Sequence, residues 1–156
     1  MKLIEFTEKD FDELYTFMQP LWLETYGEIL PKAQILFLLD KYSSTEGLTY
    51  YRAQGYRYYK IDQIGVLTIV EKTDSIYIDK LYLQPQARGK NYPSLIFTEL
   101  LKGGKDITLN VNQSNARAVN CYLKNGFIID EKTDIDLGNG MINCDYVMRK
   151  KATDTI

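Results

Sequence analysis

The hydrophobic and polar positions of the N-terminal third follow the periods of one short strand and three helices. Residues 2–6 predict a strand, and the apolar spacing of residues 7–18 predicts a helix. A second helix is predicted over residues 31–42, because proline favours a first helical position and apolar residues follow on one face. Residues 44–54 predict a short third helix, although Gly47 lowers its helix propensity.

The rest of the chain reads as strands with two further helices between them. The predicted strands are residues 56–61, 64–72, 76–83, 106–112, 127–137 and 141–150, and the predicted helices are residues 91–102 and 114–126. Gly138-Asn139-Gly140 predicts a hairpin turn between the last two strands.

This order of elements predicts an α+β fold with a mixed sheet. Most neighbouring strands are expected to be antiparallel, but the helix over residues 91–102 makes a parallel crossover between two of them. Strands and helices do not alternate throughout, which excludes a doubly wound fold. At 156 residues, one domain is expected over residues 1–150, followed by a flexible tail at residues 151–156.

Composition and charge narrow the function classes. Hydrophobic residues make up 45% of the chain and charged residues 26%, as in soluble globular proteins. The net charge of -2 argues against sequence-independent nucleic-acid binding, which needs a basic excess. No apolar run approaches membrane-spanning length, and the N-terminus is too charged for a signal peptide. We therefore expect a cytoplasmic protein with neither a nucleic-acid nor a membrane partner.

The sequence contains no histidine and two cysteines. The missing histidine excludes histidine-dependent triads and the common histidine-containing zinc sites, so no metal is expected. Cys121 and Cys144 are expected to be free thiols in a reducing compartment. Cys121 is a poor candidate for a nucleophile, because no histidine can activate it.

The turn before the helix over residues 91–102 has the features of an anion-binding site. Pro85 ends the strand, Gly89 permits a sharp turn, and Arg88 and Lys90 place positive charge at the start of the helix. Cations are disfavoured at that end of a helix unless an anion completes the site. The alternative is an ordinary strand-to-helix corner, which also favours proline, glycine and polar residues.

A second candidate stretch covers residues 112–127. On a helix beginning near Asn115, the side chains of Ala118, Cys121 and Tyr122 share one face. Two small residues beside a phenol would let a ligand lie against the helix. The alternative is that this face belongs to the hydrophobic core.

These two stretches together resemble the GNAT superfamily of acyl-CoA N-acyltransferases. "LYLQPQARGKNYPS" resembles the family's strand followed by "R-G-x-G-x-[GA]", with Asn91 and Pro93 at the later glycine positions. "NARAVNCYLKNGF" matches "N-x-x-A-x-x-x-Y-x-x-x-G-F" at every defined position. The resemblance implies a mostly antiparallel central sheet of six to seven strands with a splayed parallel pair, flanked by about four helices.

The resemblance also implies an activity and a cofactor. It implies direct transfer of an acetyl group from acetyl-CoA to a primary amine of a small molecule or peptide, with CoA as product and Tyr122 as general acid. The backbone N–H of Leu83 would polarise the thioester carbonyl. The residues that the resemblance assigns to the cofactor are Leu81, Leu83, Arg88, Gly89, Lys90, Asn91, Tyr92, Pro93, Ser94, Asn115 and Ala118.

Without histidine, the base that takes the proton of the amine would be a carboxylate, acting directly or through water. The candidates are Asp79, Glu24 and Glu71. Asp79 is the main one, because it lies on the strand that lines the active cleft in the family that the chain resembles. Asp79 could equally pair with a neighbouring lysine. Trp22, Glu24 and Tyr26 lie in a segment that resembles the family's substrate loop, although the two aromatic residues could also fill the core.

Asn91 and Pro93 favour one alternative function, a catalytically inactive CoA-binding or protein-interaction domain of the same fold. Pro93 removes one N–H donor, and a lost hydrogen bond to a charged group costs ~1.5–3 kcal/mol. Asn91 tolerates left-handed geometry better than most residues, and can also cap a helix. The identity of the acceptor, the general base and the formation of a homodimer are left open by the sequence.

Overall fold

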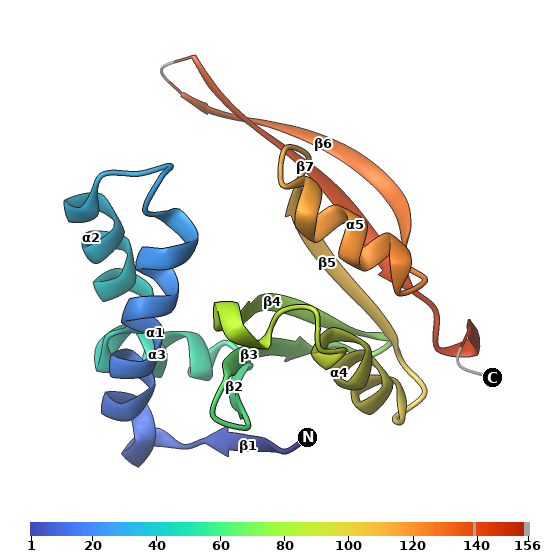
Figure 1. Cartoon of the computed structure of the whole chain (residues 1–156), viewed down its shortest axis with the longest axis horizontal. Coiled ribbons are helices and arrows are strands. Elements are labelled where there is room, and N and C mark those ends of the chain that lie inside the picture. Colours follow the sequence, from blue (N-terminus) through green and yellow to red (C-terminus); the bar gives the residue numbers. More distant parts are fainter. Residues whose placement is uncertain (139, 155–156) are drawn as a thin grey trace. The chain divides into compact units, whose positions relative to one another are not determined.

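The computed structural model describes residues 1–138 and 140–154, and within them the chain forms seven strands and five α-helices (Figure 1). The strands are β1 (Leu3–Phe6), β2 (Tyr56–Ile61), β3 (Gly65–Glu71), β4 (Ser75–Leu83), β5 (Asp106–Asn112), β6 (Ile128–Gly138) and β7 (Met141–Lys150). The helices are α1 (Phe11–Tyr26), α2 (Lys32–Ser43), α3 (Thr45–Ala53), α4 (Tyr92–Leu101) and α5 (Ala116–Lys124). Short 3-10 turns are η1 (Glu8–Asp10), η2 (Pro85–Ala87) and η3 (Ala152–Asp154).

The strands form one mixed sheet in the order β1-β2-β3-β4-β5-β7-β6. The β4–β5 pair is parallel, with a register from Ser75↔Asp106 to Ile78↔Leu109. The β1–β2, β2–β3, β5–β7 and β6–β7 pairs are antiparallel. This topology confirms the predicted mixed α+β sheet with one parallel crossover. The five helices of the described residues agree with the hydrophobic pattern, whereas the family resemblance implied about four.

The chain divides into two compact units, each described below by itself. Unit 1 comprises Met1–Val70 with Lys80–Arg88, and unit 2 comprises Glu71–Asp79 with the chain from Gly89 onward. The single domain expected over residues 1–150 stays a prediction. Position 139 of the predicted hairpin turn and positions 155–156 of the predicted tail lie outside the described residues.

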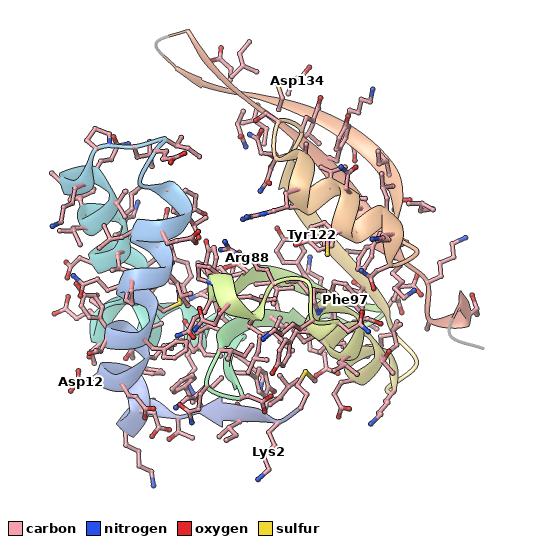
Figure 2. All side chains as sticks on the ribbon, in the orientation of Figure 1. Lys2, Asp12, Arg88, Phe97, Tyr122 and Asp134 are labelled. Carbon is pink, nitrogen blue, oxygen red and sulfur yellow. The ribbon has the colours of Figure 1, made fainter. Side chains whose placement is uncertain are left out.

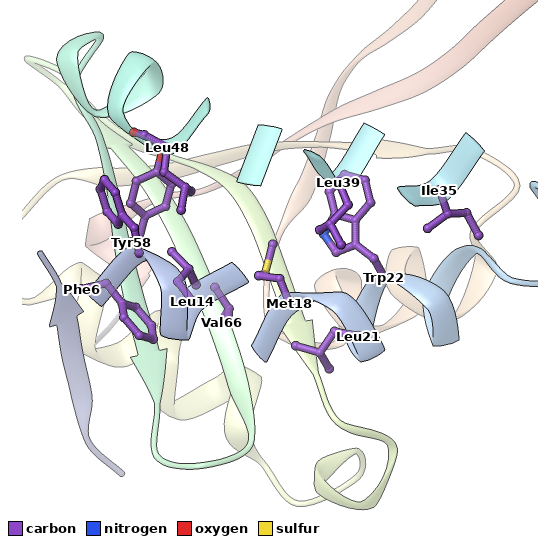
Figure 3. Packing of buried hydrophobic residues seen from close by; sticks show 11 residues of the cluster. Phe6, Leu14, Met18, Leu21, Trp22, Ile35, Leu39, Leu48, Tyr58 and Val66 are labelled. Atoms are coloured by element: carbon purple, nitrogen blue, oxygen red, sulfur yellow. Dashed lines mark hydrogen bonds between the residues drawn. The ribbon is translucent and has the colours of Figure 1, made fainter. Parts of the chain in front are cut away.

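The core of unit 1 is formed by α1, α2 and α3 together with strand residues from β1, β2 and β3 (Figure 3). Its helical members recur at three- and four-residue spacing, as a helix with one buried face requires. The buried hydrophobic residues of this core are Phe6, Phe11, Leu14, Met18, Leu21, Trp22, Ile35, Leu39, Leu48, Tyr58 and Val66.

Helix α1 extends further than the sequence pattern predicted. It ends at Tyr26 instead of near residue 18, and it passes through Pro20. Proline removes one backbone hydrogen bond from a helix interior, but Pro20 lies on the exposed side, and Leu21 and Trp22 continue the buried face beyond it. The segment expected to be a substrate loop is therefore largely the last turns of α1.

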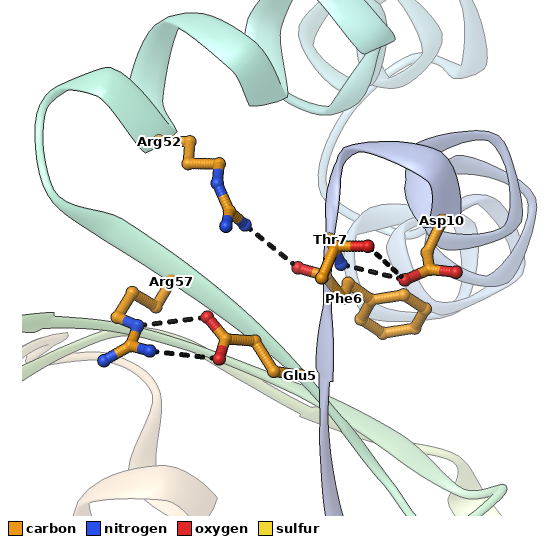
Figure 4. A network of polar contacts seen from close by, with 6 residues as sticks. All are labelled: Glu5, Phe6, Thr7, Asp10, Arg52 and Arg57. Atoms are coloured by element: carbon orange, nitrogen blue, oxygen red, sulfur yellow. Dashed lines mark hydrogen bonds and ion pairs between the residues drawn. The ribbon is translucent and has the colours of Figure 1, made fainter.

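Polar contacts fasten the start of α1 and the neighbouring strands (Figure 4). The Asp10 carboxylate accepts hydrogen bonds from the backbone N–H of Thr7 at 2.8 Å and from its hydroxyl at 3.0 Å, and the backbone bond in particular lowers the pKa of Asp10. Arg57 of β2 donates two hydrogen bonds to Glu5 of β1, at 3.1 and 3.0 Å.

Unit 2 holds α4, α5 and the long β6–β7 hairpin (Figure 1). Helix α4 buries four side chains, and β5 alternates buried and more exposed positions towards its end. The buried side chains of α4 are Ile96, Phe97, Leu100 and Leu101. Among the described helices, none is both long and apolar enough to cross a membrane.

Gly47, which weakened the prediction of α3, is required by its packing. The helix forms as predicted, and the Ser44 side chain caps it by accepting a hydrogen bond from the Gly47 N–H at 3.1 Å. A Cβ atom at Gly47 would overlap the carbonyl oxygen of Lys41 and lie 2.9 Å from the carbonyl carbon of Tyr42. The absent side chain allows the start of α3 to approach the end of α2.

We predict that Gly47→Ala destabilises the chain. Helix propensity alone would stabilise it by up to about 1 kcal/mol, whereas the overlap with backbone should cost about 1–3 kcal/mol. The free energy of unfolding, measured by chemical denaturation, decides the sign. Gly103→Ala is the matched control, because nothing lies within 4 Å of a Cβ built there. Equal or greater stability of Gly47→Ala would contradict the packing argument.

Candidate active-site residues

The turn before α4 adopts the backbone geometry of an anion-binding loop. Gly89 has a φ of +77°, and Asn91, the N-cap position, has a φ of 63° and a ψ of 9°, which is left-handed. A non-glycine residue in this region is uncommon, and asparagine is among the residues that tolerate it best. Asn91 thus takes the geometry of the glycine that it replaces, while its side chain makes no capping hydrogen bond.

The start of α4 leaves backbone donors ahead of the first helical hydrogen bond. That bond runs from the Leu95 N–H to the Asn91 carbonyl at 3.1 Å, so the N–H groups of Tyr92 and Ser94 have no acceptor within the helix. Pro93 contributes no donor. A Cβ built on Gly89 meets no atom within 4 Å, so the turn is open on that side. The turn therefore offers the backbone donors of Tyr92 and Ser94 but none from Pro93, and its role as an anion site stays a prediction.

Arg88 is not a free cation of this site. In unit 1 its guanidinium donates to both carboxylate oxygens of Glu24, at 2.9 and 2.6 Å, and Nη2 also donates to the carbonyl oxygen of Leu83 at 3.2 Å. The hydrogen bonds to Glu24 raise the pKa of Arg88. The sequence assigned Arg88 to the cofactor and Glu24 to the acceptor, whereas the structure joins the two side chains. Lys90 is exposed in the turn.

The other two predicted acceptor residues belong to an aromatic cluster in unit 1. Trp22 is only 6% exposed and packs against Tyr26 and Tyr82, with ring centroids 5.3 and 6.1 Å away. The hydroxyls of Tyr26 and Tyr82 lie 2.8 Å apart. Trp22 therefore fills the core, as the alternative interpretation expected. The sequence did not single out Tyr82 as a member of this cluster. Strand alternation indicates only that its side chain lies on the face of β4 opposite to those of Leu81 and Leu83.

Residues of the second motif form the two ends of α5. The Asn115 side chain caps the helix by accepting from the Ala118 N–H at 3.3 Å. At the other end Gly126 has a φ of +87°, and the Phe127 N–H donates to the carbonyl oxygen of Tyr122 at 3.0 Å. This left-handed glycine ending closes the helix.

Tyr122 lies in an aromatic cluster that links α4 and α5 within unit 2. Figure 2 labels Tyr122 on α5 and Phe97 on α4. The ring centroid of Tyr122 is 6.1 Å from that of Phe97 and 5.4 Å from that of Phe127. Burial, with a smaller contribution from Cys121, raises the pKa of Tyr122 to about 12. The phenol is therefore protonated at neutral pH. Phe97, which the sequence did not single out, is recognisable only as one of the apolar residues of α4.

The candidate general bases differ in their surroundings. Glu71 accepts a hydrogen bond from Lys105 at 3.0 Å in an exposed ion pair, and Glu24 is bound by Arg88. Asp79 is half-buried on β4, where alternation places its side chain on the same strand face as those of Leu81 and Leu83.

Both cysteines are free thiols, as predicted. Burial raises the pKa of Cys121, and a hydrogen bond with Asp134 raises that of Cys144. Raised thiol pKa values leave little of the reactive thiolate, which agrees with the low expectation for Cys121 as a nucleophile.

Known proteins resemble this chain in sequence and in fold. The model of the acetyltransferase (GNAT) family matches residues 11–127. Peptidyl-lysine N-acetyltransferase YjaB of Escherichia coli is 31% identical over 74 residues, which cover 46% of this chain and 50% of that protein. YjaB of Salmonella typhimurium is 30% identical over 60 residues, covering 38% and 41%. The matched segments thus span half or less of these curated relatives.

Solved structures share the fold at lower identity. PaiA N-acetyltransferase from Thermoplasma acidophilum, in complex with coenzyme A, has a TM-score of 0.72 and 22% identity, covering 96% of this chain and 98% of that one. The apo form of E. coli YjaB has a TM-score of 0.66 and 18% identity, with 95% of each chain covered. Since the family model spans most of the chain and agrees with this topology, the chain belongs to the GNAT acetyltransferase family.

Proposed function

We propose that this chain transfers an acetyl group from acetyl-CoA to a primary amine of a small molecule or peptide, with Tyr122 as proton donor. One observation carries the proposal. The ring of Tyr122 packs against Phe97 of α4, and α4 is the helix whose start forms the open anion-binding turn. A cofactor grip and a protonated phenol are thus held by one packed cluster.

The residues of the turn fit the pyrophosphate of acetyl-CoA. Backbone N–H groups at a helix start, with the positive end of the helix dipole behind them, are a general anion site. The left-handed Asn91 and the open space at Gly89 allow an anion to approach the backbone, and Lys90 adds charge. When bound, acetyl-CoA supplies the acetyl group as an activated thioester. Leu83 stays the candidate for polarising its carbonyl through the backbone N–H.

Tyr122 has the protonation state that a general acid needs. Ordinary thiols have a pKa of about 8.5, so a departing thiolate gains from a nearby hydrogen-bond donor. The raised pKa of Tyr122 keeps the phenol protonated at neutral pH, so that its O–H can donate a hydrogen bond to the sulfur as charge develops there. Among the described residues, none competes for the phenol hydroxyl through a hydrogen bond that the structure records.

A primary amine is the acceptor class best supported. Two curated relatives are peptidyl-lysine N-acetyltransferases, and a solved neighbour is a chimera of spermidine N-acetyltransferase SpeG from Vibrio cholerae and hSSAT. In a chain without histidine, the amine must lose its proton to a carboxylate or to water. Asp79 stays the main candidate base, as the resemblance implies, because it lies on the strand that contributes Leu81 and Leu83.

A second function, CoA binding without catalysis, is favoured by the turn itself. Pro93 lacks a donor, and the guanidinium of Arg88 is engaged by Glu24. Both features weaken the grip relative to a glycine-rich loop with a free arginine. Binding and turnover have to be measured separately to distinguish the two functions.

We predict micromolar binding of acetyl-CoA and CoA to the purified chain, measured by calorimetric titration. Dephospho-CoA should bind similarly if the pyrophosphate provides most of the contact. Pro93→Ala restores one N–H donor and should tighten binding by up to about tenfold. Absence of binding at millimolar cofactor would make the turn a structural corner and would contradict both functions.

Tyr122→Phe should lower kcat by about a hundredfold, because general acids typically contribute that much or more, while the Kd for acetyl-CoA changes little. Steady-state turnover with a panel of amines, together with calorimetry, measures both quantities. Tyr50→Phe is the control, since Tyr50 is 61% exposed. Equal turnover of Tyr122→Phe and the wild type would remove Tyr122 from the mechanism.

The raised pKa of Tyr122 can be measured directly from the ultraviolet absorbance of phenolate. We expect the phenol of Tyr122 to ionise near pH 12, so the phenolate absorbance gained near that pH should fall by one tyrosine in Tyr122→Phe but not in Tyr50→Phe. The folded phenol keeps its proton above the unfolded pKa of about 10, so its ionisation should lower the stability of the chain above that pH. An unchanged absorbance gain near pH 12 in Tyr122→Phe would contradict the raised pKa of Tyr122.

A further inference from the structure

In unit 1 an ion pair between residues 64 positions apart joins the last turns of α1 to Arg88, in the segment that follows β4. Glu24 lies in the last turns of α1, and both of its carboxylate oxygens accept from Arg88. The same guanidinium donates to the carbonyl oxygen of Leu83, the last residue of β4. One side chain therefore holds the end of a helix and the end of a strand together.

The bidentate geometry of this contact should make it more stabilising than a typical surface ion pair. Two parallel N–H···O bonds fix the planes of both groups, and charge-assisted bonds are about twice as strong as neutral ones. The side chains are 26% and 38% exposed. A second contact between the same two elements, the Tyr26–Tyr82 hydroxyl pair, lies beside the buried Trp22.

Occupation by Glu24 leaves Arg88 unsuited to a phosphate. A bidentate carboxylate uses two of the guanidinium donors, and the Leu83 carbonyl takes a third. The charge of Arg88 is also compensated by Glu24, so the pair adds no net charge to the neighbouring turn. A phosphate could reach only the two of the five guanidinium N–H donors that these three contacts leave over.

We propose that Arg88 and Glu24 act as one pair of positioning residues, and that neither is a direct ligand of the cofactor or of the amine. Their contact holds the end of β4, where Leu83 offers its backbone N–H, against the end of α1. The inference rests on the proposed acetyl transfer. It predicts that loss of the pair lowers the rate of the chemical step and leaves the affinity for acetyl-CoA unchanged.

The test is a double-mutant cycle with Glu24→Gln, Arg88→Gln and the double variant, following kcat, the KM for the amine and the Kd for CoA. Each single substitution should lower kcat by about tenfold, the effect of losing one charge-assisted contact in the transition state. The double variant should be no slower than either single variant, because both remove the same contact. The Kd for CoA should stay within about twofold of the wild-type value, since no phosphate contact is lost.

Glu5 and Arg57 provide a matched control. They form a bidentate pair of the same chemistry in unit 1, between β1 and β2 (Figure 4). Glu5→Gln and Arg57→Gln should leave kcat, KM and Kd unchanged. A loss of kcat in this cycle as well would show a general effect of stability and would overturn the specific role of Arg88 and Glu24.

Two other outcomes are distinguishable. If Arg88→Gln weakens CoA binding while Glu24→Gln does not, Arg88 is a phosphate ligand and the positioning role is wrong. If Glu24→Gln raises only the KM for the amine, Glu24 is an acceptor ligand, and the proposal fails while the proposed function stands. A wild-type chain that neither binds CoA nor acetylates any amine contradicts the proposed function, and the positioning role with it.

Discussion

The packing of Tyr122 against Phe97 and Phe127 is the contact on which the rest of unit 2 depends. Phe97 and Phe127 are almost fully buried, with ring centroids 4.9 Å apart, and their edge-to-face contact fixes α4 relative to the end of α5. The Asn115 cap and the left-handed Gly126 then set where α5 starts and stops. The residues of the motif around Tyr122 thus have a structural role in packing and ending α5, apart from any role in the reaction.

Side-chain charge and backbone polarity contribute differently to the proposed anion site before α4. Sequence reasoning counted Arg88 and Lys90 as two cations for an anion. In the structure the charge of Arg88 is compensated by Glu24, so the proposed anion site would rest mainly on oriented backbone N–H groups and the helix dipole. Asn91 has the left-handed backbone that glycine adopts most easily, so a side chain at this position does not prevent that geometry.

Local patterns predicted most of the fold, because strand alternation and helix periodicity are recorded in neighbouring residues. The prediction failed where distant residues decide. Proline ends many helices, yet α1 continues through Pro20 because Leu21 and Trp22, which follow it, are buried in the core of unit 1. Helix α3 forms as predicted, but the close backbone approach to α2 that requires Gly47 is a tertiary contact, which helix propensity does not record. Likewise, the candidate site residues were found through their motif, but the pairing of Arg88 with Glu24 spans 64 positions and leaves no local signal.

The raised pKa values of Tyr122, Cys121 and Cys144 have a consequence for how the protein responds to acidity. These three groups lose their protons at a higher pH than usual, and the sequence has no histidine side chain, which would titrate near neutral pH. These three groups therefore keep their charge state across the physiological range. A steep dependence of acetylation on acidity in that range would then report another ionisation, that of the incoming amine or of the carboxylate that takes its proton.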